Sequence, residues 1–365
     1  MTKPIRVLCV FSTLDRGGAE TMCMNLYRYI DRSKVQFDFV KHTSIKGAFE
    51  DEITQLGGRV FEAPRYKVYN TIQYELWWKS HLENHPEHQM IHGHFFTISA
   101  VYFSVAKKLG RRTIGHIHAS ISDGLIKKFL VKRINHVTDY PIACSQHAGY
   151  WIYGERPFRV LNNALDTELF HYEEKERKVY RDKLNLGDCL VLGTVANLSS
   201  VKNPMGLIDI FLKVHAKQKD SKLLWVGEGT QRDLIEERIN QEGITDSVFL
   251  LGQRGDVYKL LQAMDAFLLP SLNEGLPVSL IEAQAAGLPC YVSDTVTTEV
   301  DITGLCHFLP LNRWDQWADA ILSDKTQRMD TSQKIIEAGY DIRSTAKWLE
   351  EFYLSIGTAE SVNRS

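Results

Sequence analysis

The sequence predicts an α/β protein with two domains, each built on a parallel sheet. The chain has 365 residues, which is enough for two domains of ordinary size that each bury a core. Short apolar runs alternate with helical patterns along the chain, as they do where parallel strands are joined by helices. A charged segment at 166–187, poor in apolar residues after Phe170, separates the halves and predicts a linker with a surface helix.

The first half contains strand-like apolar runs with helical patterns between them. The runs expected to form strands are residues 6–12, 37–40, 59–62, 90–94, 113–118 and 140–144. The helical patterns include residues 21–30, 72–83 and 99–109. Because helices separate the strands, neighbouring strands should run parallel.

The second half repeats this pattern and ends in an amphipathic helix. The expected strands are residues 189–196, 222–227, 248–252, 266–270 and 289–294. A helix is expected at 277–286, since Pro277 suits its first turn and Gly287 its end. The last helix, at about 341–356, carries three aromatic side chains.

Composition and charge exclude several classes of function. Charged residues make up 24% and hydrophobic residues 44% of the chain, as in ordinary soluble globular proteins. The formal net charge is −2, so no basic field favours nucleic acid as a partner. The six cysteines form no C-x-x-C pair. We expect them to be small core residues of a protein in a reducing compartment. No apolar run approaches the roughly 18 residues of a membrane span, and no signal peptide is visible, so we expect a cytoplasmic protein.

Two glutamates, Glu274 and Glu282, are separated by seven residues in the most informative stretch of the chain. Glu274 should lie in the loop between the strand 266–270 and the following helix, and Glu282 one or two turns into that helix. Such a loop offers free N–H groups and the positive end of a helix dipole, which suit a ligand with phosphate and hydroxyl groups. The alternative is a helix N-terminal charge and a solvated surface glutamate.

Five motifs occur in order around these glutamates. They are GGAE at 17–20, HIH at 116–118, LNNALDTELF at 161–170, VGEG at 226–229 and the EGLP-containing glutamate motif at 271–294. Together they resemble the retaining glycosyltransferases of glycosyltransferase family 4. The likeness covers nearly the whole chain and is to bacterial enzymes that build capsular or extracellular polysaccharide.

The resemblance implies a GT-B fold, in which two Rossmann-like domains face each other across a cleft. We expect residues 1–165 to form the acceptor-side domain and 166–340 the nucleotide-sugar domain. Residues 341–365 should form a helix that crosses back to the first domain. Ligands of such open sheets bind beyond the carboxyl ends of the strands, which places the expected site in the cleft.

The resemblance also assigns roles in donor binding. Glu274 matches the family's contact to the donor sugar hydroxyls and is a candidate catalytic residue, and Glu282 matches the contact to the ribose. Residues 275–277, which are Gly275, Leu276 and Pro277, belong to the same donor motif. The loop with Gly17 and Gly18 matches the one that lies over the donor phosphates and sugar, although a plain glycine turn is the alternative.

The donor diphosphate needs charge neutralisation as it leaves. The sequence lacks an Asp-x-Asp motif, so we expect no metal there and no cofactor. Lys202 matches the lysine that serves this purpose in the family. The family's arginine is missing, because Asn197 and Ser199 occupy the places where it is often found. Arg254 is a candidate substitute, although a solvated arginine is about as plausible.

Two His-x-His pairs, His92 with His94 and His116 with His118, could each share one face of a strand. We interpret them as non-metal residues, because the sequence near them supplies no further ligands. His118 matches the family's histidine near the donor sugar and is a candidate catalytic residue. His94 and His116 either contact the acceptor or are packed and hydrogen-bonded.

A basic helical stretch at 124–137 could contact an anionic membrane surface, where lipid-linked acceptors reside. The alternative is an ordinary amphipathic helix with a solvated basic face. If it makes that contact, the protein would work at the inner face of the membrane.

The resemblance therefore predicts a retaining transferase that moves a sugar from a nucleoside-diphosphate donor, expected to be a UDP-sugar, to a glycan or lipid-linked glycan. A sugar-nucleotide epimerase of the same fold is one alternative. The missing arginine motivates a second, a catalytically weak sugar-nucleotide-binding partner subunit.

Overall fold

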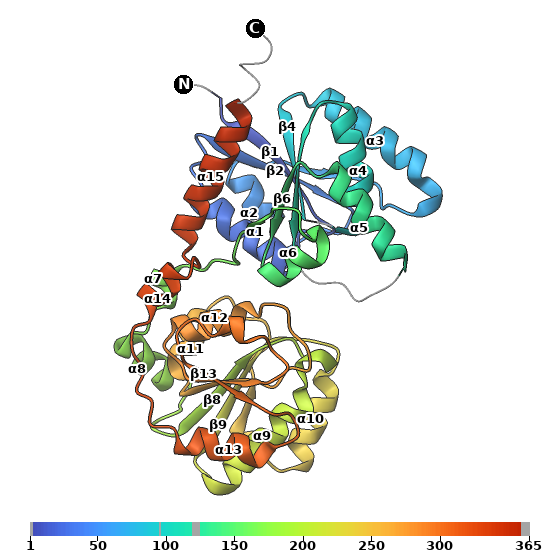
Figure 1. Cartoon of the computed structure of the whole chain (residues 1–365). Coiled ribbons are helices and arrows are strands. Elements are labelled where there is room, and N and C mark those ends of the chain that lie inside the picture. Colours follow the sequence, from blue (N-terminus) through green and yellow to red (C-terminus); the bar gives the residue numbers. More distant parts are fainter. Residues whose placement is uncertain (1–2, 95, 119–124, 359–365) are drawn as a thin grey trace. The chain divides into compact units, whose positions relative to one another are not determined.

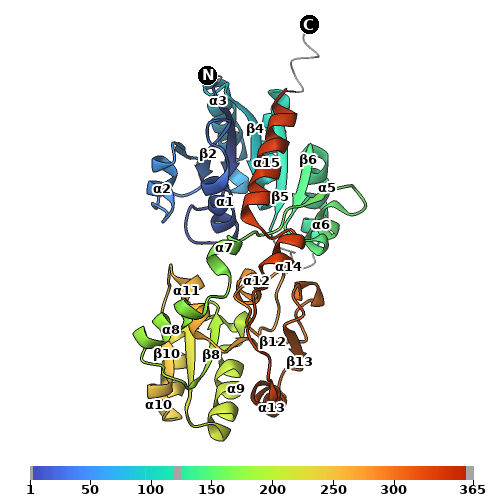
Figure 2. The ribbon, with the colours of Figure 1, turned by 90° about the vertical axis from the view of Figure 1, so that its left-hand side faces the viewer.

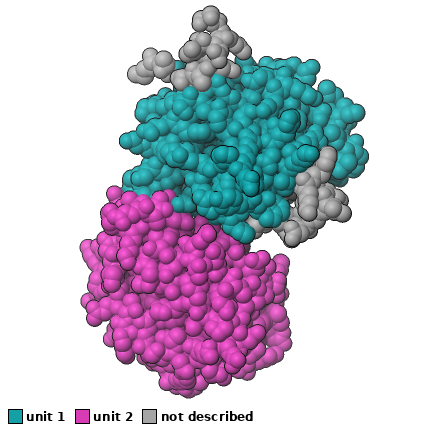
Figure 3. Space-filling view, in the orientation of Figure 1, with its two compact units in different colours: residues 1–164, 341–365 teal, residues 165–340 magenta. Residues whose placement is uncertain are grey.

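A computed structural model describes residues 3–94, 96–118 and 125–358, and the chain divides into two compact units (Figure 3). Unit 1 comprises residues 1–164 and 341–365, and unit 2 comprises residues 165–340. Each unit contains one parallel sheet with helices on both faces. The predicted α/β class with two parallel sheets is confirmed.

Unit 1 is built on a seven-stranded sheet with strand order β3-β2-β1-β4-β5-β6-β7. Its strands are β1 (Ile5–Val10), β2 (Val35–Lys41), β3 (Val60–Glu62), β4 (His88–Gly93), β5 (Arg112–Ile117), β6 (Tyr140–Ala143) and β7 (Arg159–Val160). Every pairing is parallel. The central strands β1 and β4 are buried along most of their length because both faces of the sheet are covered, although β4 contains the polar residues His88, Gln89 and His92.

The helices of unit 1 cover both faces of this sheet (Figures 1 and 2). They are α1 (Gly18–Tyr29), α2 (Glu50–Gln55), η1 (Val68–Asn70), α3 (Thr71–Asn84), α4 (Phe96–Lys108), α5 (Leu125–Val137), α6 (Gln146–Tyr153) and α15 (Ile342–Thr358). Helices α1 and α15 share one apolar cluster, and α3 and α4 share another. The terminal helix α15 therefore belongs to the core of unit 1, where Tyr353 is fully buried.

Unit 2 has a six-stranded sheet with order β10-β9-β8-β11-β12-β13. Its strands are β8 (Leu190–Val195), β9 (Ser221–Val226), β10 (Val248–Leu250), β11 (Ala266–Leu269), β12 (Cys290–Ser293) and β13 (Cys306–Leu309). Its helices are α7 (Thr167–Phe170), α8 (Glu174–Lys183), η2 (Ser200–Lys202), α9 (Pro204–Lys217), α10 (Arg232–Gln241), η3 (Thr245–Ser247), α11 (Val257–Ala263), α12 (Val278–Ala285), η4 (Thr298–Val300), α13 (Trp314–Ser323) and α14 (Ser332–Glu337). Two separate apolar clusters lie on its two faces.

Most predicted elements are confirmed within a few residues, but two edge strands were missed. β7 has two residues and β13 has four, and both lie at the edge of a sheet. Edge strands are short and partly solvated, so they carry little apolar pattern in the sequence. The segment at 166–187 contains α7 and α8, in agreement with the predicted linker and surface helix.

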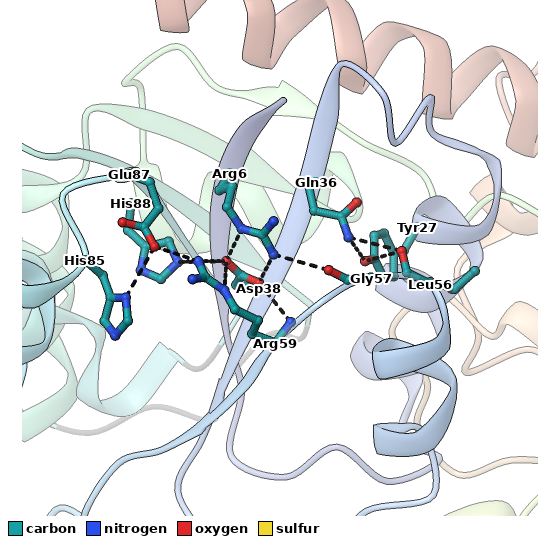
Figure 4. Close-up of polar contacts among 10 residues, drawn as sticks. All are labelled: Arg6, Tyr27, Gln36, Asp38, Leu56, Gly57, Arg59, His85, Glu87 and His88. Carbon is teal, nitrogen blue, oxygen red and sulfur yellow. Dashed lines mark hydrogen bonds and ion pairs between the residues drawn. The ribbon is translucent and has the colours of Figure 1, made fainter. Parts of the chain in front are cut away.

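A buried carboxylate, Asp38, ties together the strands of unit 1 (Figure 4). Its side chain is fully buried and accepts hydrogen bonds from Arg6 Nε at 2.6 Å and from Arg59 Nη2 at 2.6 Å. A third hydrogen bond joins its Oδ2 to His88 Nε2 at 2.8 Å. Burial alone would raise the pKa of Asp38, but these bonds outweigh it and hold the pKa well below its usual range. The network thus joins β1, β2 and β4 through one charge.

Candidate functional site

The glutamate motif of unit 2 lies where three neighbouring strands end. The loops that follow β8, β11 and β12 start at the same edge of the sheet, because these strands are adjacent and parallel. Glu274 lies in the loop between β11 and α12, as the sequence predicts. Glu282 lies just beyond the first turn of α12.

Asn203 fastens the β8 loop to the β11 loop. Its backbone has φ of 53°, in the left-handed region that asparagine tolerates better than most residues. From this position its Oδ1 caps α9 by accepting from Gly206 N at 3.2 Å, and its Nδ2 donates to Pro270 O at 3.1 Å. A backbone hydrogen bond from Leu272 N to Val201 O, at 2.8 Å, runs beside these contacts. The two loops are therefore held together on both sides of Lys202.

Lys202 and Glu274 form an ion pair between these two loops. Lys202 Nζ donates to Glu274 Oε1 at 2.5 Å. The two side chains retain 23% and 10% of their accessible surface, so the pair is partly shielded but can still be reached from solvent. One positive and one negative group are thus presented side by side at the edge of the sheet.

The β9 loop, which contains the VGEG motif, packs directly against the β8 loop. Gly227 has φ of 147°, and a Cβ at this position would collide with the carbonyl of Ala196. A Cβ at Gly229 would collide with the carbonyl of Leu198. Leu198 N also donates to Glu228 O at 3.1 Å. The two glycines are therefore needed for close packing of the loop that leads to Lys202.

Glu282 is a largely buried carboxyl group without a protein partner. Among the described residues its side chain makes no hydrogen bond or ion pair. Part of its residue surface remains accessible. Burial raises the pKa of Glu282 to about 7, because no nearby positive charge or donor compensates for the lost water. This carboxylate is available for hydroxyl groups of a ligand.

The start of α12 contributes backbone groups beside this carboxylate. Pro277 is the N-cap residue, and no side chain caps the helix. Gly275 is exposed, and a Cβ there would meet no atom within 4 Å. Leu276 packs against the core of unit 2. Gly287, with φ of 68°, follows the end of the helix as predicted.

The two other predicted donor residues of unit 2 lie in exposed positions. Asn197 is exposed just beyond β8. Arg254 follows β10 and forms a two-point ion pair with Asp256, at 2.8 Å and 2.7 Å. The Arg254 hydrogen bonds lower the pKa of Asp256 to about 2. Arg254 would have to share or give up this partner in order to bind a phosphate.

In unit 1 the Gly17–Gly18 loop connects β1 to α1. Gly17 is the N-cap of α1 and offers no side-chain cap. A Cβ at Gly17 would collide with the carboxylate of Glu20, whose pKa is raised by burial. Gly18 begins the helix and faces open space. The loop leaves the helix N-terminus accessible and brings one carboxylate close to it.

The two His-x-His pairs meet on one face of the unit 1 sheet. His94 Nδ1 and His118 Nε2 are hydrogen-bonded at 2.8 Å, and the rings of His92 and His116 lie 5.4 Å apart. His92 Nδ1 is also 2.5 Å from the hydroxyl of Tyr353 on α15. Burial lowers the pKa of His92 and His118 to about 3, and those of His94 and His116 well below the usual range. All four imidazoles are therefore neutral at physiological pH.

The four histidines differ in accessibility. His116 is fully buried, so a direct contact between it and an acceptor would require the surrounding side chains to move. His118 is partly exposed at the end of β5. The sequence indicated that each pair shares a face, but it could not show that the two pairs touch.

Several predicted features fall partly outside the described residues. Of the basic stretch at 124–137, residue 124 and the side chains of residues 125–130 lie outside the described part of the chain. Lys132 and Arg133 are exposed on α5. No helix among the described residues is both long and apolar enough to span a bilayer.

Sequence reasoning missed the residues that support the site. Asn203 caps α9 and holds the β11 loop, yet it resembles any helix N-cap in the sequence. Ser293 and Thr295 both donate to Ser271 O, at 2.5 Å and 2.9 Å, and so fix the start of the loop that carries Glu274. The only signal in the sequence for the contact of Ser293 and Thr295 with Ser271 is that polar residues occur at the ends of β11 and β12.

Two family models and several known proteins match this chain. The family model described as Glycosyl transferases group 1 matches residues 176–341, and the one described as Glycosyltransferase Family 4 matches residues 16–169. A Bacillus subtilis protein described as "Putative glycosyltransferase EpsF" is 31% identical over 98% of this chain and 98% of its own length.

Two further relatives carry information about ligands of their own. An Escherichia coli enzyme, UDP-Gal:alpha-D-GlcNAc-diphosphoundecaprenol alpha-1,3-galactosyltransferase, is 32% identical over 37% of this chain and 36% of its own. The crystal structure of Anabaena HepE in complex with UDP and glucose superposes with a TM-score of 0.77. The superposition covers 96% of this chain and 100% of the HepE chain, and the two sequences are 19% identical. This similarity shows a shared fold.

Proposed function

Because this chain belongs to the retaining glycosyltransferases of family 4, we propose that it transfers a sugar from a UDP-sugar to a hydroxyl of a glycan or lipid-linked glycan acceptor. The reaction would serve the assembly of an extracellular or capsular polysaccharide. The observation that carries the proposal is the Lys202–Glu274 pair, held at the carboxyl edge of the unit 2 sheet, together with the unpartnered Glu282 on the helix that follows this loop.

Unit 2 is proposed to bind the donor. Lys202 would neutralise the diphosphate, Glu274 would accept hydrogen bonds from hydroxyls of the transferred sugar, and Glu282 would accept them from the ribose. Backbone N–H groups of Gly275, Leu276 and Val278 at the start of α12 favour the same negative charge, whereas Pro277 has no N–H group. Asn197 and Arg254 are secondary candidates for donor contacts, because both lie in loops at this edge.

Unit 1 is proposed to bind the acceptor and to close over the donor with the Gly17–Gly18 loop. His118 would hydrogen-bond the transferred sugar or position the acceptor hydroxyl, with His94 hydrogen-bonded behind it. A cavity beyond β1, β2 and β3 offers polar groups for a glycan, among them Thr43, Glu62 and Arg65. An acceptor linked to a lipid would bring unit 1 to a membrane surface, and residues 124–137 are the segment proposed to contact it.

The chemical step breaks the bond between the anomeric carbon and the UDP oxygen and forms a glycosidic bond to the acceptor oxygen. Negative charge grows on the leaving diphosphate, and Lys202 with the α12 N-terminus stabilises it. The proton of the acceptor hydroxyl passes to the oxygen of the leaving diphosphate as the new bond forms, so UDP and the glycoside are the products. No carboxylate of this chain is assigned as a nucleophile on the opposite face of the sugar, so a same-face transfer accounts for retention without a double displacement.

A panel of nucleotide sugars tests the proposal. The purified full chain should be stabilised against heat by one UDP-sugar more than by nucleotides with other bases. With that donor and an acceptor glycan it should release UDP and form an α-linked product if the donor is α-linked. Conversion of the donor without an acceptor would identify an epimerase. Tight UDP binding without transfer to any glycan would identify a binding subunit.

The environment of Glu282 leads to a specific prediction for nucleoside binding. Glu282→Ala is expected to weaken uridine and UDP binding by roughly 10- to 100-fold, because a hydrogen bond to a charged group is worth roughly 1.5–3 kcal/mol. Isothermal calorimetry measures both affinities. Glu237→Ala removes an exposed carboxylate of α10 in the same unit and is the matched control, for which no change is expected.

The same carboxyl group predicts a pH dependence. Its pKa of about 7 in the free protein should fall when ribose hydroxyls donate to the ionised form, so uridine affinity should rise with pH up to about 7 and fall below it. Uridine is the probe of choice because it has no phosphate that titrates in this range. The dependence should vanish in Glu282→Gln. A uridine affinity of the wild type that does not change with pH would contradict the proposed contact between Glu282 and the ribose.

A further inference from the structure

Three strands of unit 1 bring metal-ligating side chains to one point. β1, β4 and β5 are adjacent, and the register pairs Cys9 with His92 and His92 with Ile114. Since alternate residues of a strand point to the same face, His94, His116 and His118 extend the same row toward the carboxyl ends of the strands. The four imidazoles and one thiol thus share one face of the sheet.

The nitrogens of these imidazoles are poorly satisfied. His116 is fully buried, and neither of its ring nitrogens has a hydrogen-bond partner among the described residues. His92 Nε2, His94 Nε2 and His118 Nδ1 are likewise buried and unpartnered. A buried polar atom without a partner costs about 1–3 kcal/mol, and such atoms are usually satisfied by a water or an ion. Several of them in one cluster can therefore bind a water or an ion.

Three of these imidazoles lie close enough together to share one metal ion. One nitrogen from each of His94, His116 and His118 lies within 4.8 Å of the other two. Tetrahedral zinc with Zn–N bonds of about 2.0–2.1 Å places its ligands about 3.4 Å apart. The distance of 2.8 Å between His94 Nδ1 and His118 Nε2 is already close to this ligand–ligand distance. Three imidazole ligands would require the His116 nitrogen and this pair to come within about 3.4 Å of one another.

A second possible set, Cys9 with His92 and His94, is less suitable. A thiol must lose its proton to bind zinc, and Cys9 is fully buried beside Cys23 in an apolar cluster, where a thiolate would be costly. His92 is further occupied by Tyr353. A set of three histidines needs no buried thiolate, since imidazole binds a metal ion in its neutral form.

We propose that His94, His116 and His118 form a binding site for one zinc-like divalent cation in unit 1. Three histidines with a fourth position left for water correspond to a known ligand set of catalytic zinc sites. Imidazole ligands select zinc, copper, cobalt or nickel over magnesium or calcium. If His118 also has the role proposed for it in transfer, which rests on the proposed function, a bound ion would occupy it and inhibit the enzyme.

The test uses full-length protein without a polyhistidine tag, stripped with chelator. Titration with Co²⁺ should give the intense visible absorption of a tetrahedral site at one equivalent, and Zn²⁺ should displace it. His94→Phe and His116→Phe should each lose the signal and weaken Zn²⁺ binding by at least roughly 10- to 100-fold. His147→Ala removes an exposed histidine of α6 and should bind as the wild type does.

Two folded phenylalanine variants that bind Zn²⁺ like the wild type would overturn the proposal, and so would a wild type that binds no stoichiometric metal. Circular dichroism and the thermal transition establish folding for each variant. Should one variant fail to fold, the other decides, because each removes one of three ligands. Inhibition of transfer by Zn²⁺ is read separately, so a chain that binds metal without catalysing transfer would refute only the proposed function.

Discussion

Asp38→Asn is expected to lower the free energy of unfolding of unit 1 by about 3–5 kcal/mol. The asparagine keeps the shape of the side chain but removes the buried negative charge that Arg6, Arg59 and His88 share in the network of Figure 4, and leaves Arg59 with only its outer acidic partner Glu87. Two guanidinium groups would then share a buried neutral partner. Urea denaturation of the full chain, monitored by tryptophan fluorescence, measures the change. Asp51→Asn, which alters an exposed pair with Lys46, is the control and should change stability by less than about 1 kcal/mol.

The same carboxylate predicts how stability depends on pH. Its pKa in the folded protein lies well below the value of about 3.9 for an unfolded aspartate. At pH values below about 4 the unfolded carboxyl binds a proton that the folded one does not, so stability falls with falling pH. The contribution of Asp38 is complete above about pH 4 and is lost as the pH drops toward the folded-state pKa. The wild type should therefore lose stability faster than Asp38→Asn in this acid range. Equal acid sensitivity of the two proteins would contradict the pairing.

This network shows why the architecture was predictable and its stabilising contacts were not. Alternation of buried strands with helices is a local pattern, and it was sufficient to predict two parallel sheets. Arg6, Asp38, Arg59 and His88 are separated by 21 to 32 positions from one to the next, and each lies within or just outside a strand. Their contact depends on strand order and register, which no local pattern encodes.

In the candidate site, too, the local motifs were predictable and the contacts between distant residues were not. The glutamate motif could be recognised because Glu274 and Glu282 lie on one strand–loop–helix segment, where spacing determines position. The partner of Glu274 lies 72 positions earlier. A resemblance pointed to Lys202, but only the adjacency of β8 and β11 brings it to the carboxylate. The histidine pairs are similar: alternation predicts each pair, and the pairing of β4 with β5 joins them.

Lys202→Ala is expected to weaken UDP binding by roughly 10- to 100-fold while leaving uridine binding nearly unchanged. Without a ligand, Lys202 and Glu274 neutralise each other at 2.5 Å. A donor would separate their tasks, with the lysine on the diphosphate and the carboxylate on sugar hydroxyls. Removing the lysine deletes the cation and leaves Glu274 unpaired near the phosphates, where it repels them. Calorimetry with UDP and with uridine measures the two effects.

Glu274→Gln should act in the opposite direction on the nucleotide. It frees Lys202 from its partner, so UDP should bind equally well or a few-fold more tightly, whereas sugar transfer should fall by roughly 10- to 100-fold. The double variant should regain part of the UDP affinity lost in Lys202→Ala, because the repelling carboxylate is gone. Lys213→Ala, which removes an exposed lysine paired with Asp315, is the matched control. If uridine and UDP lose affinity equally in Lys202→Ala, the lysine holds the two loops together, and Arg254 becomes the better candidate for the diphosphate.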